Sequence, residues 1–370
     1  MKEYNWRQER EKFRTDFSRQ ESPAGGKIEI TIGRKPVPPK SLAGGVLGAL
    51  LLLAVIAAVL FFCFRSGSDS STQLAQAAEK NKAAVGLVTL DVELQNGRKI
   101  VNPIGTAWAF SENSFATNGH VANGLRSKLM AIIEASVAEK LMEEARKQNC
   151  KSVEELFAKL GNDAGKVKEN ARKEILAMIK DVRASVIING TLKKSYYVKS
   201  LQVHKDYGVA GTRFNPDVAV LNIEGRHDQS FKLADKKTLH NLKSGTPIAF
   251  LGFPMENLDS NNVNIDNPVA SMQSGIVVAV TDFDMKDSGK ERNFLLRHNL
   301  PATGGASGSP IFNKKGEVVA LLYAGNVIGQ VSGRGNVVRA PSAAQINFGV
   351  RVDLLSGVGE AVTVKDFLKL

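Results

Sequence analysis

Three short stretches decide how this sequence is read: residues 116–122 read ATNGHVA, residues 215–221 read NPDVAVL and residues 304–310 read GGASGSP. They place a histidine, an aspartate and a serine in that order along the chain. A serine hydroxyl attacks a carbonyl only poorly unless an imidazole takes its proton and a carboxylate holds that imidazole in the correct tautomer. His120, Asp217 and Ser307 are therefore the residue types that acyl transfer requires.

The turn around Ser307 suits the same chemistry. Its glycines permit a tight backbone that aims amide N–H groups at one point, where an oxyanion would develop. Pro310 and an apolar run follow it, which argues against a merely flexible loop. The order His–Asp–Ser is the order of chymotrypsin and differs from the orders of subtilisin and of α/β-hydrolases.

Each of these residues also has an ordinary structural explanation. A lone histidine after a strand is more often structural, and Asn-Pro-Asp at 215–217 is a turn signal in its own right. Asp206 is a competing carboxylate, but no apolar strand follows it as one follows Asp217. Metal-ligand spacing is missing among the other histidines, which are His204, His227, His240 and His298. We therefore expect no metal and no cofactor.

From residue 85 onward, short apolar runs rich in β-branched residues alternate with Gly, Asn and Asp. Runs of this kind and spacing predict antiparallel strands of a barrel or a sandwich. The predicted strands cover residues 85–92, 106–110, 218–223, 247–251, 274–280, 318–323 and 346–352. Asn96-Gly97 and Lys315-Gly316 are typical of hairpin turns. The sequence therefore predicts an all-β domain.

One region interrupts the β pattern. A period of four residues, set among Glu and Lys, marks an amphipathic helix with apolar positions at Leu125, Leu129, Ile133, Val137 and Leu141. Ser152 followed three residues later by Glu155 forms a capping box, and Asn162 or Asp163 would cap a last helix. We expect a helical insertion over residues 123–182, whose near balance of charges indicates solvated faces.

The amino-terminal part predicts a membrane anchor. Residues 42–64 form an uncharged apolar run, long enough as a helix to cross a hydrocarbon core of ~30 Å. A buried core helix seldom runs this long without a polar residue, and a cleaved signal peptide has a shorter apolar run and a shorter leader. Lys and Arg concentrate in residues 1–41, which favours a cytoplasmic tail. A polar linker and a short helix are expected over residues 65–84.

The formal net charge is +12 and the sequence pI is about 9.5. The basic residues are scattered among acidic ones, without a long basic run or an aromatic-interleaved basic motif, so we expect no nucleic-acid partner. Cys63 and Cys150 lie far apart, the first within the apolar run. We therefore expect no disulfide framework.

Taken together, the motifs resemble those of the trypsin-like serine protease superfamily, and most closely its bacterial HtrA-type branch. Besides the three motifs quoted first, the resemblance rests on Leu-Gly-Phe-Pro at 251–254, Ser-Gly-Ile-Val at 274–277 and Asn-Phe-Gly at 347–349. It implies a chymotrypsin-like fold of two six-stranded antiparallel β-barrels, here with an α-helical insertion and a preceding transmembrane helix. The protease domain would occupy residues 85–370.

The resemblance also implies a role for each matching residue. His120 would be the general base, Asp217 its orienting acid and Ser307 the nucleophile, and the backbone N–H groups of Gly305 and Ser307 would form the oxyanion hole. Pro301 would lie at the base of the primary specificity pocket, where an acid would otherwise select Lys or Arg. A small or apolar pocket is therefore expected. The residues that would bind the substrate backbone are Tyr323, Ala324 and Gly325.

The sequence departs from the HtrA-type pattern in several places. Ala306 replaces the usual Asp or Asn before the serine, and Ser309 replaces the common second glycine. No PDZ-like domain follows the closing strand, so regulation through such a domain is not expected. The helical insertion directly follows the histidine motif, where it would gate the substrate cleft or bind a partner.

Two functions follow as expectations. The first is a single-pass membrane serine endopeptidase on the outer or periplasmic face of a bacterial cytoplasmic membrane, which cleaves polypeptides in quality control or regulated proteolysis. The second is a latent or non-catalytic binding module, whose cleft or helical insertion holds a partner. The intact triad favours the first. Activation through a homo-oligomer stays open.

Overall fold

The computed structural model describes residues 69–254, 264–301, 303–324, 327–331, 337–341 and 346–369, without the side chains of 324, 327–331 and 337–341. They belong to one compact unit, Gly67–Leu370, of the two into which the chain divides. The predicted tail and the predicted transmembrane helix at residues 42–64 lie outside these residues. Within the described part of the chain, no helix is both long and apolar enough to span a membrane.

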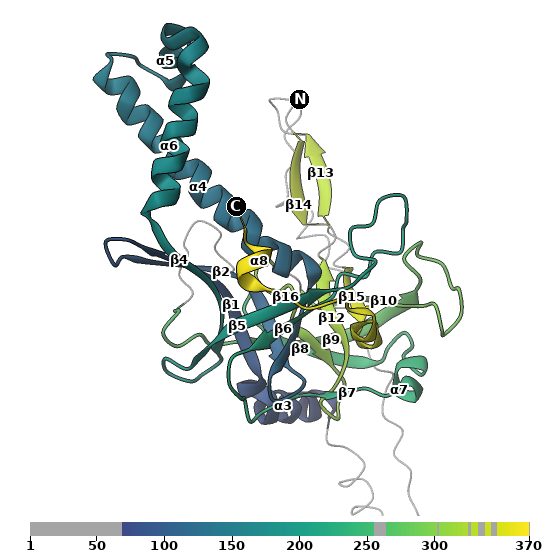
Figure 1. Cartoon of the computed structure of the whole chain (residues 1–370). Helices are drawn as coiled ribbons and strands as arrows, with labels where there is room; N and C mark the ends of the chain where they lie inside the picture. Colours follow the sequence, from purple (N-terminus) through teal and green to yellow (C-terminus); the bar gives the residue numbers. More distant parts are fainter. Residues whose placement is uncertain are drawn as a thin grey trace, which may run out of the picture. The chain divides into compact units, whose positions relative to one another are not determined.

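The first barrel consists of six antiparallel strands in the order β5-β4-β1-β2-β3-β6, closed by pairing of β6 with β5 (Figure 1). A short strand, β16 (Val362–Thr363), extends the sheet at β5. The barrel strands are β1 (Val85–Leu94), β2 (Lys99–Ala109), β3 (Ser114–Thr117), β4 (Ile179–Ile188), β5 (Ser195–Val203) and β6 (Ala219–Ile223).

The second barrel closes in the same way, in the order β11-β8-β9-β10-β15-β12 with β12 returning to β11. Its strands are β8 (Pro247–Gly252), β9 (Ser271–Thr281), β10 (Leu295–His298), β11 (Pro310–Phe312), β12 (Glu317–Ala324) and β15 (Asn347–Arg351). The strand β7 (Lys232–Leu233) runs parallel to β12, and β13 (Val327–Val331) pairs only with β14 (Val337–Pro341). The two predicted six-stranded barrels are confirmed.

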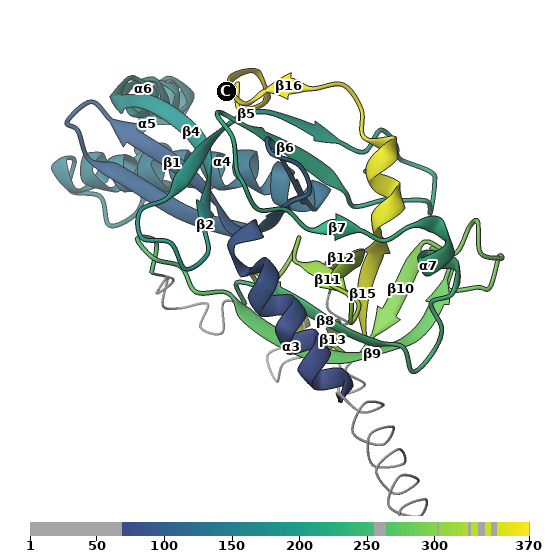
Figure 2. The same cartoon turned by 90° about the horizontal axis from the view of Figure 1, so that it is seen from below.

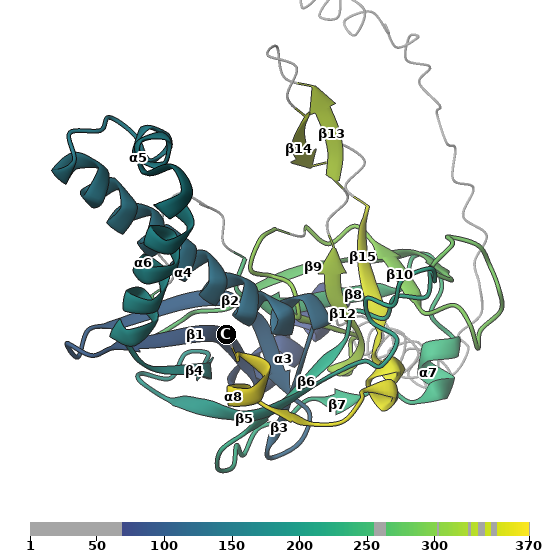
Figure 3. The same cartoon turned by 45° about the horizontal axis from the view of Figure 1, so that its top comes forward.

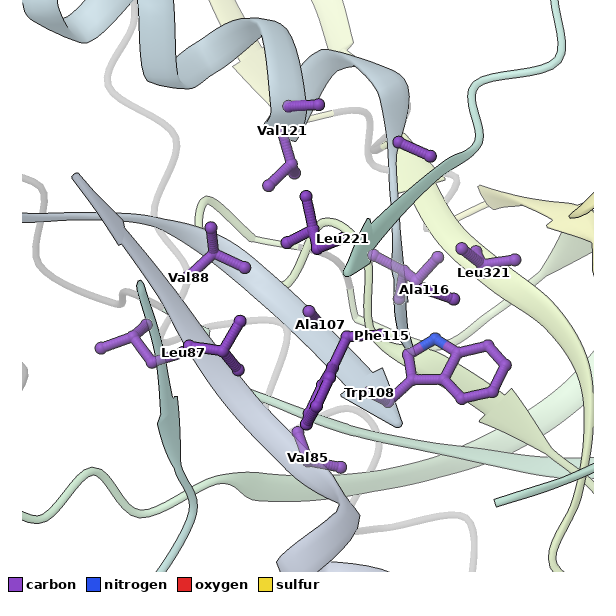
Figure 4. Packing of buried hydrophobic residues seen from close by; sticks show 14 of the residues in the cluster. Val85, Leu87, Val88, Ala107, Trp108, Phe115, Ala116, Val121, Leu221 and Leu321 are labelled. Carbon is purple, nitrogen blue, oxygen red and sulfur yellow. The ribbon is translucent and has the colours of Figure 1, made fainter. Parts of the chain in front are cut away.

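The core of the first barrel consists of buried apolar side chains from its strands. Figure 4 shows Trp108 and Phe115 side by side, with Val121 reaching in from the helix above them. All three are at most 1% exposed, and burying a side chain of this kind contributes roughly 1.5–3 kcal/mol. Positive φ angles at Gly97 (82°) and Gly316 (76°) mark the two predicted hairpin turns.

The helix α3 (Ser70–Asn81) precedes the first barrel and packs against β8 and β9 of the second, as Figure 2 shows. Its buried face consists of Leu74, Ala77 and Ala78. Asp69 caps it by accepting a hydrogen bond from the Ser71 N–H. A 3₁₀ turn, η1 (Lys82–Ala84), then leads into β1.

The helical insertion consists of α4 (Gly119–Lys147), α5 (Val153–Leu160), the 3₁₀ turn η2 (Gly161–Asp163) and α6 (Ala164–Met178). The five apolar positions predicted for its first helix are all buried. Ser152 caps α5, since its Oγ accepts from the Glu155 N–H at 3.2 Å. Asp163 is the N-cap residue of α6 but makes no capping hydrogen bond there. Two short helices, α7 (Lys236–His240) and α8 (Val364–Phe367), and the 3₁₀ turn η3 (Val352–Gly357) complete the fold.

The helix α4 begins earlier than the sequence predicted. It starts at Gly119 and so includes His120, whereas the insertion was expected from residue 123. Figures 1 and 3 show α4 crossing the first barrel and then projecting beyond it, with α5 at its far end and α6 alongside. The histidine motif and the insertion are therefore one continuous helix.

Candidate active site

His120 and Asp217 meet at the edge of the first barrel. His120 lies in the first turn of α4, and Asp217 lies two residues before β6. The His120 Nδ1 is 2.5 Å from one carboxylate oxygen of Asp217, and the His120 backbone N–H donates to the other oxygen at 2.8 Å. The Asp217 side chain is 5% exposed and that of His120 is 40% exposed. The carboxylate is thus buried behind an imidazole that remains open to solvent.

The start of α4 explains this geometry. A helix begins with backbone N–H groups that have no partner inside the helix. Asn118, the N-cap residue, does not cap them and instead donates from its side chain to the Asp217 carbonyl at 2.8 Å. Asp217 supplies the missing acceptor from a distant part of the chain, and its negative charge is favoured by the positive end of the helix dipole. The Asp217 carboxylate therefore both caps the start of α4 and hydrogen-bonds the His120 imidazole.

Two tyrosines lie near the Asp217 carboxylate. Burial, together with the negative charge of Asp217, raises the pKa of Tyr207 to about 12. The same two causes raise the pKa of Tyr323. The ring of Tyr207 also covers Gly119, where an added Cβ would come within 2.8 Å of its Cδ1. Both phenols therefore stay neutral at neutral pH.

The loop that carries Ser307 lies against the first barrel. The Thr106 N–H on β2 donates to the Ser307 carbonyl at 2.9 Å, and the Thr106 hydroxyl donates to the Gly305 carbonyl at 2.9 Å. Inside the loop, the Ala306 N–H donates to the Thr303 carbonyl at 3.2 Å. These bonds fix the backbone on both sides of Ala306.

A close backbone approach brings the serine loop to the histidine motif. Gly308 has φ +88°, and an added Cβ would lie 2.1 Å from the Thr106 carbonyl oxygen and 2.5 Å from the Thr117 Oγ1. Only glycine fits there, because both the φ angle and the space exclude a side chain. Since Thr117 precedes His120 by three residues, the residue after Ser307 is packed against the segment that leads into α4.

Two amide groups of the serine loop remain open. Within the described residues, neither the Gly305 N–H nor the Ser307 N–H makes a hydrogen bond to another backbone group or to a side chain. Gly305 and Ser307 are both half-buried, and one of the two amides belongs to the residue that carries the serine hydroxyl, so both are available to an external acceptor. Amides of this kind can stabilise an oxyanion that develops at Ser307.

The predicted substrate-binding residues are only partly described. Pro301 is exposed at the start of the serine loop, directly after the buried Leu300. Tyr323 is half-buried on β12, with its ring centroid 6.4 Å from that of Phe348. Ala324 ends β12 and has no described side chain, and Gly325 lies outside the described residues.

The remaining histidines are structural. Three are buried, and burial lowers the pKa of each: His204, His227 and His298. No cluster of metal-ligating side chains occurs among residues for which the structure describes side chains. Cys150 is a buried free thiol at the far end of the insertion, and Cys63 lies outside the described residues.

Sequence reasoning missed several residues that shape this site. Thr106, Thr117 and Tyr207 contact the triad segments from strand or loop positions that look ordinary in the sequence. Asn118 lies within the quoted histidine motif, but the motif does not reveal that its side chain holds the Asp217 backbone. These residues matter because they contact segments that are distant in sequence. A local sequence motif does not contain that information.

This chain is similar in sequence to one known family and in structure to several proteases. The sequence matches the family model of the trypsin-like peptidase domain over residues 105–321. No curated protein matches the sequence significantly. Among solved structures, the HtrA-type protease AlgW with a decapeptide is 12% identical with a TM-score of 0.41, and Deg5 is 13% identical with a TM-score of 0.40.

The match to AlgW covers 76% of this chain and 64% of the AlgW chain, so this chain spans less than two thirds of that protein. The match to Deg5 covers 79% of this chain and 94% of the Deg5 chain. The trypsin-like peptidase model spans more than half of the sequence and includes the segments that carry His120, Asp217 and Ser307. This chain therefore belongs to the trypsin-like peptidase family.

Proposed function

We propose that this protein is a membrane-anchored serine endopeptidase that hydrolyses peptide bonds through an acyl-enzyme on Ser307. The observation that carries the proposal is the double contact of the buried Asp217 with the His120 imidazole and backbone. Such a carboxylate fixes the imidazole tautomer, so that Nε2 is the nitrogen that accepts a proton. The half-exposed imidazole would then be available to take a proton from the Ser307 hydroxyl.

The proposed reaction has two halves. The Ser307 hydroxyl attacks the scissile carbonyl and passes its proton to His120, while the charge on Asp217 stabilises the imidazolium. The Gly305 and Ser307 N–H groups donate to the oxyanion of the tetrahedral intermediate. Collapse of the intermediate expels the amine, which takes the proton from His120, and water then hydrolyses the acyl-enzyme by the same steps.

The substrates that we propose are polypeptides with a small or apolar side chain before the scissile bond. The resemblance supports this specificity, because it would put Pro301 at the pocket position where an acid would otherwise select a Lys or Arg side chain. We further propose that residues 42–64 anchor the protein in a bacterial cytoplasmic membrane with residues 85–370 on the outer or periplasmic side, where it acts in quality control or regulated proteolysis. The charge asymmetry around the apolar run supports that orientation.

Active-site labelling tests the catalytic part of the proposal. We expect a fluorophosphonate probe to label the full chain in detergent, and labelling to vanish in Ser307→Ala and in His120→Ala. Ser309→Ala is the matched control, since this buried neighbouring serine makes no hydrogen bond through its hydroxyl within the described residues. Absence of labelling in folded wild-type protein would favour the alternative, a latent enzyme or a binding module.

Membrane anchoring needs its own test. The full chain should stay in the membrane pellet after a carbonate wash, whereas a chain that begins at Gly67, the start of the compact unit, should be released. Protease added to intact spheroplasts should then degrade the carboxyl-terminal unit. Release of the full chain by carbonate would refute the anchor and leave the catalytic proposal untouched.

A further inference from the structure

We infer that Thr106 is a positioning residue for the oxyanion hole: it holds the Gly305 and Ser307 backbone so that both amides face the reacting carbonyl. The inference rests on the proposed function, because it concerns how the proposed hole is kept in shape. Thr106 lies on β2 of the first barrel, whereas both residues that it holds lie in a loop of the second. No sequence motif assigns it a role.

Two hydrogen bonds from one residue carry the argument. The Thr106 hydroxyl donates to the Gly305 carbonyl, and the Thr106 backbone N–H donates to the Ser307 carbonyl, each at 2.9 Å. Gly305 and Ser307, the two residues fixed in this way, both keep their own N–H groups without a partner within the described residues. Holding a residue by its carbonyl leaves its amide available and limits how far the peptide can rotate.

The Thr106 side chain is itself held firmly. Its hydroxyl donates its one proton to the Gly305 carbonyl and accepts the Phe253 N–H at 3.1 Å, so partners on two sides fix the position of the oxygen. Its carbonyl accepts the Thr117 hydroxyl at 2.7 Å, and the residue is 0% exposed. A β-branched side chain also has a restricted χ1 angle. The donor to Gly305 therefore has a fixed position.

The loop needs such an external restraint. Gly305 has φ +83° and Gly308 has φ +88°, so the nucleophile lies between two residues with wide conformational freedom. Rotation at Gly305 would turn its N–H away from the hole without any steric penalty from a side chain. The Thr106 hydroxyl opposes this rotation, because rotation would break its partly buried hydrogen bond to the Gly305 carbonyl.

The test compares Thr106→Val, which keeps the shape and loses the hydroxyl, with Thr106→Ser, which keeps the hydroxyl. In the full chain, we expect Thr106→Val to lower kcat roughly tenfold to a hundredfold with little change in KM, below the ~10²–10³-fold loss for deleting an oxyanion donor itself. Thr106→Ser should recover most of the activity. Thr89→Val is the matched control, since Thr89 is an equally buried threonine on β1 whose hydroxyl bonds Asp91.

A second readout separates positioning from general loosening of the fold. A peptide aldehyde forms a tetrahedral adduct whose oxyanion uses the hole, whereas the matching peptide alcohol forms no adduct and carries no oxyanion. Thr106→Val should weaken inhibition by the aldehyde at least tenfold and leave inhibition by the peptide alcohol within about twofold. Equal effects on both inhibitors, or wild-type kcat in Thr106→Val, would overturn the inference and spare the proposed function. A wild-type chain that forms no adduct at all, matching Ser307→Ala, would overturn both.

Discussion

At the residue scale, one carboxylate performs two tasks. Asp217 orients His120 through Nδ1 and also accepts the backbone N–H at the start of α4. Asp217→Asn should therefore lower kcat by about 10⁴-fold, because the amide presents a donor where the imidazole needs an acceptor. Steady-state kinetics on a peptide substrate measures this, with circular dichroism to confirm that α4 remains folded. Activity within tenfold of wild type would contradict the assigned role of Asp217.

A second residue-scale prediction concerns Gly252 and Ser309, which pack directly against each other. An added Cβ at Gly252 would lie 1.8 Å from the Ser309 Oγ, so the serine hydroxyl occupies the space that an alanine needs. Gly252→Ala should cost about 1–3 kcal/mol of unfolding free energy through overpacking. Adding Ser309→Gly should restore most of that loss, and urea unfolding of both single variants and the double variant measures the coupling. Additive effects would contradict the steric explanation.

Gly252 and Ser309 also illustrate which features of the site can be predicted from sequence and which cannot. His120, Asp217 and Ser307 were predicted from local motifs, because each motif needs its own neighbours, such as the glycines around Ser307. The Leu-Gly-Phe-Pro segment was recognised only as part of a resemblance. The structure gives its residues physical reasons: Gly252 makes room for Ser309, and the Phe253 N–H bonds Thr106. Such reasons depend on partners distant in sequence, so the segment alone does not reveal them.

At the element scale, the apolar stripe of α4 winds around the helix. Its buried residues recur every four positions from Val121 to Ala145, and each such step overshoots a full turn by about 40°. The stripe therefore faces the first barrel at its start, where Val121 lies over Gly105, and faces the other helices at its end. Ala145 packs with Cys150 and Leu156 in a cluster separate from the main core. The four-residue period therefore predicts the helix. It also predicts that the buried side of the helix turns from the barrel toward the other helices.

The separate cluster leads to a prediction about the insertion. Replacing residues 142–168 by a short Gly-Ser linker removes α5 and the far ends of α4 and α6, while Val121 to Leu141 stay in place. We expect the midpoint of thermal unfolding to change by only a few degrees, because the removed residues pack mainly on one another. If the insertion gates the cleft, kcat/KM for a short peptide should change severalfold. An unchanged value would refute gating and leave partner binding as the role of the insertion.

The loop before β6 joins the two barrels near the site. Phe214 contacts Phe283 edge-on at 5.4 Å and Phe294 at 6.0 Å, both on the second-barrel loop between β9 and β10. Because Asp217 follows three residues later, we expect Phe214→Ala to lower stability by about 1–3 kcal/mol and to reduce kcat as well. Phe214→Leu should recover part of both. Urea unfolding and peptide kinetics together test this, and a stability loss with full activity would show that the contact does not position Asp217.

The start of α4 marks the limit of local prediction for an element. The sequence indicated a helix from residue 123, because its apolar period becomes visible there. The helix in fact begins at Gly119, since Asp217, almost a hundred residues away, accepts the first N–H group that a local cap would otherwise take. The seven strand segments predicted from β-branched runs, by contrast, agree with the structure to within a few residues except at β2, which begins seven residues earlier. The barrel strands β3, β4, β5, β10 and β11 were not among the predicted segments.

At the scale of the whole molecule, buried histidines make the folded protein less stable at acidic pH. Burial lowers the pKa of His298 to about 4, and it also lowers the pKa values of His204 and His227. Near pH 7 these groups are neutral in both states. As the pH falls below about 6.5, the unfolded chain binds protons that the folded chain does not, so stability declines toward pH 4. Urea midpoints should therefore fall steadily between pH 7 and pH 5.

His298→Leu isolates one part of this effect. Neither ring nitrogen of His298 makes a well-formed hydrogen bond within the described residues, and only the Phe348 backbone offers a weak contact, so an apolar side chain loses little there. The variant should show a flatter dependence of the urea midpoint on pH than the wild-type protein. An unchanged slope would mean that the other two histidines account for the acid sensitivity.

The position of His120 in the first turn of α4 has a mechanical consequence. The helix has 29 residues, a rod of about 44 Å whose base holds the imidazole and whose tip carries α5. Because His120 belongs to the same continuous helix, we expect a tilt imposed at the tip to turn the peptide plane that carries the imidazole. A molecule bound at the tip would then change the orientation of His120 from a distance.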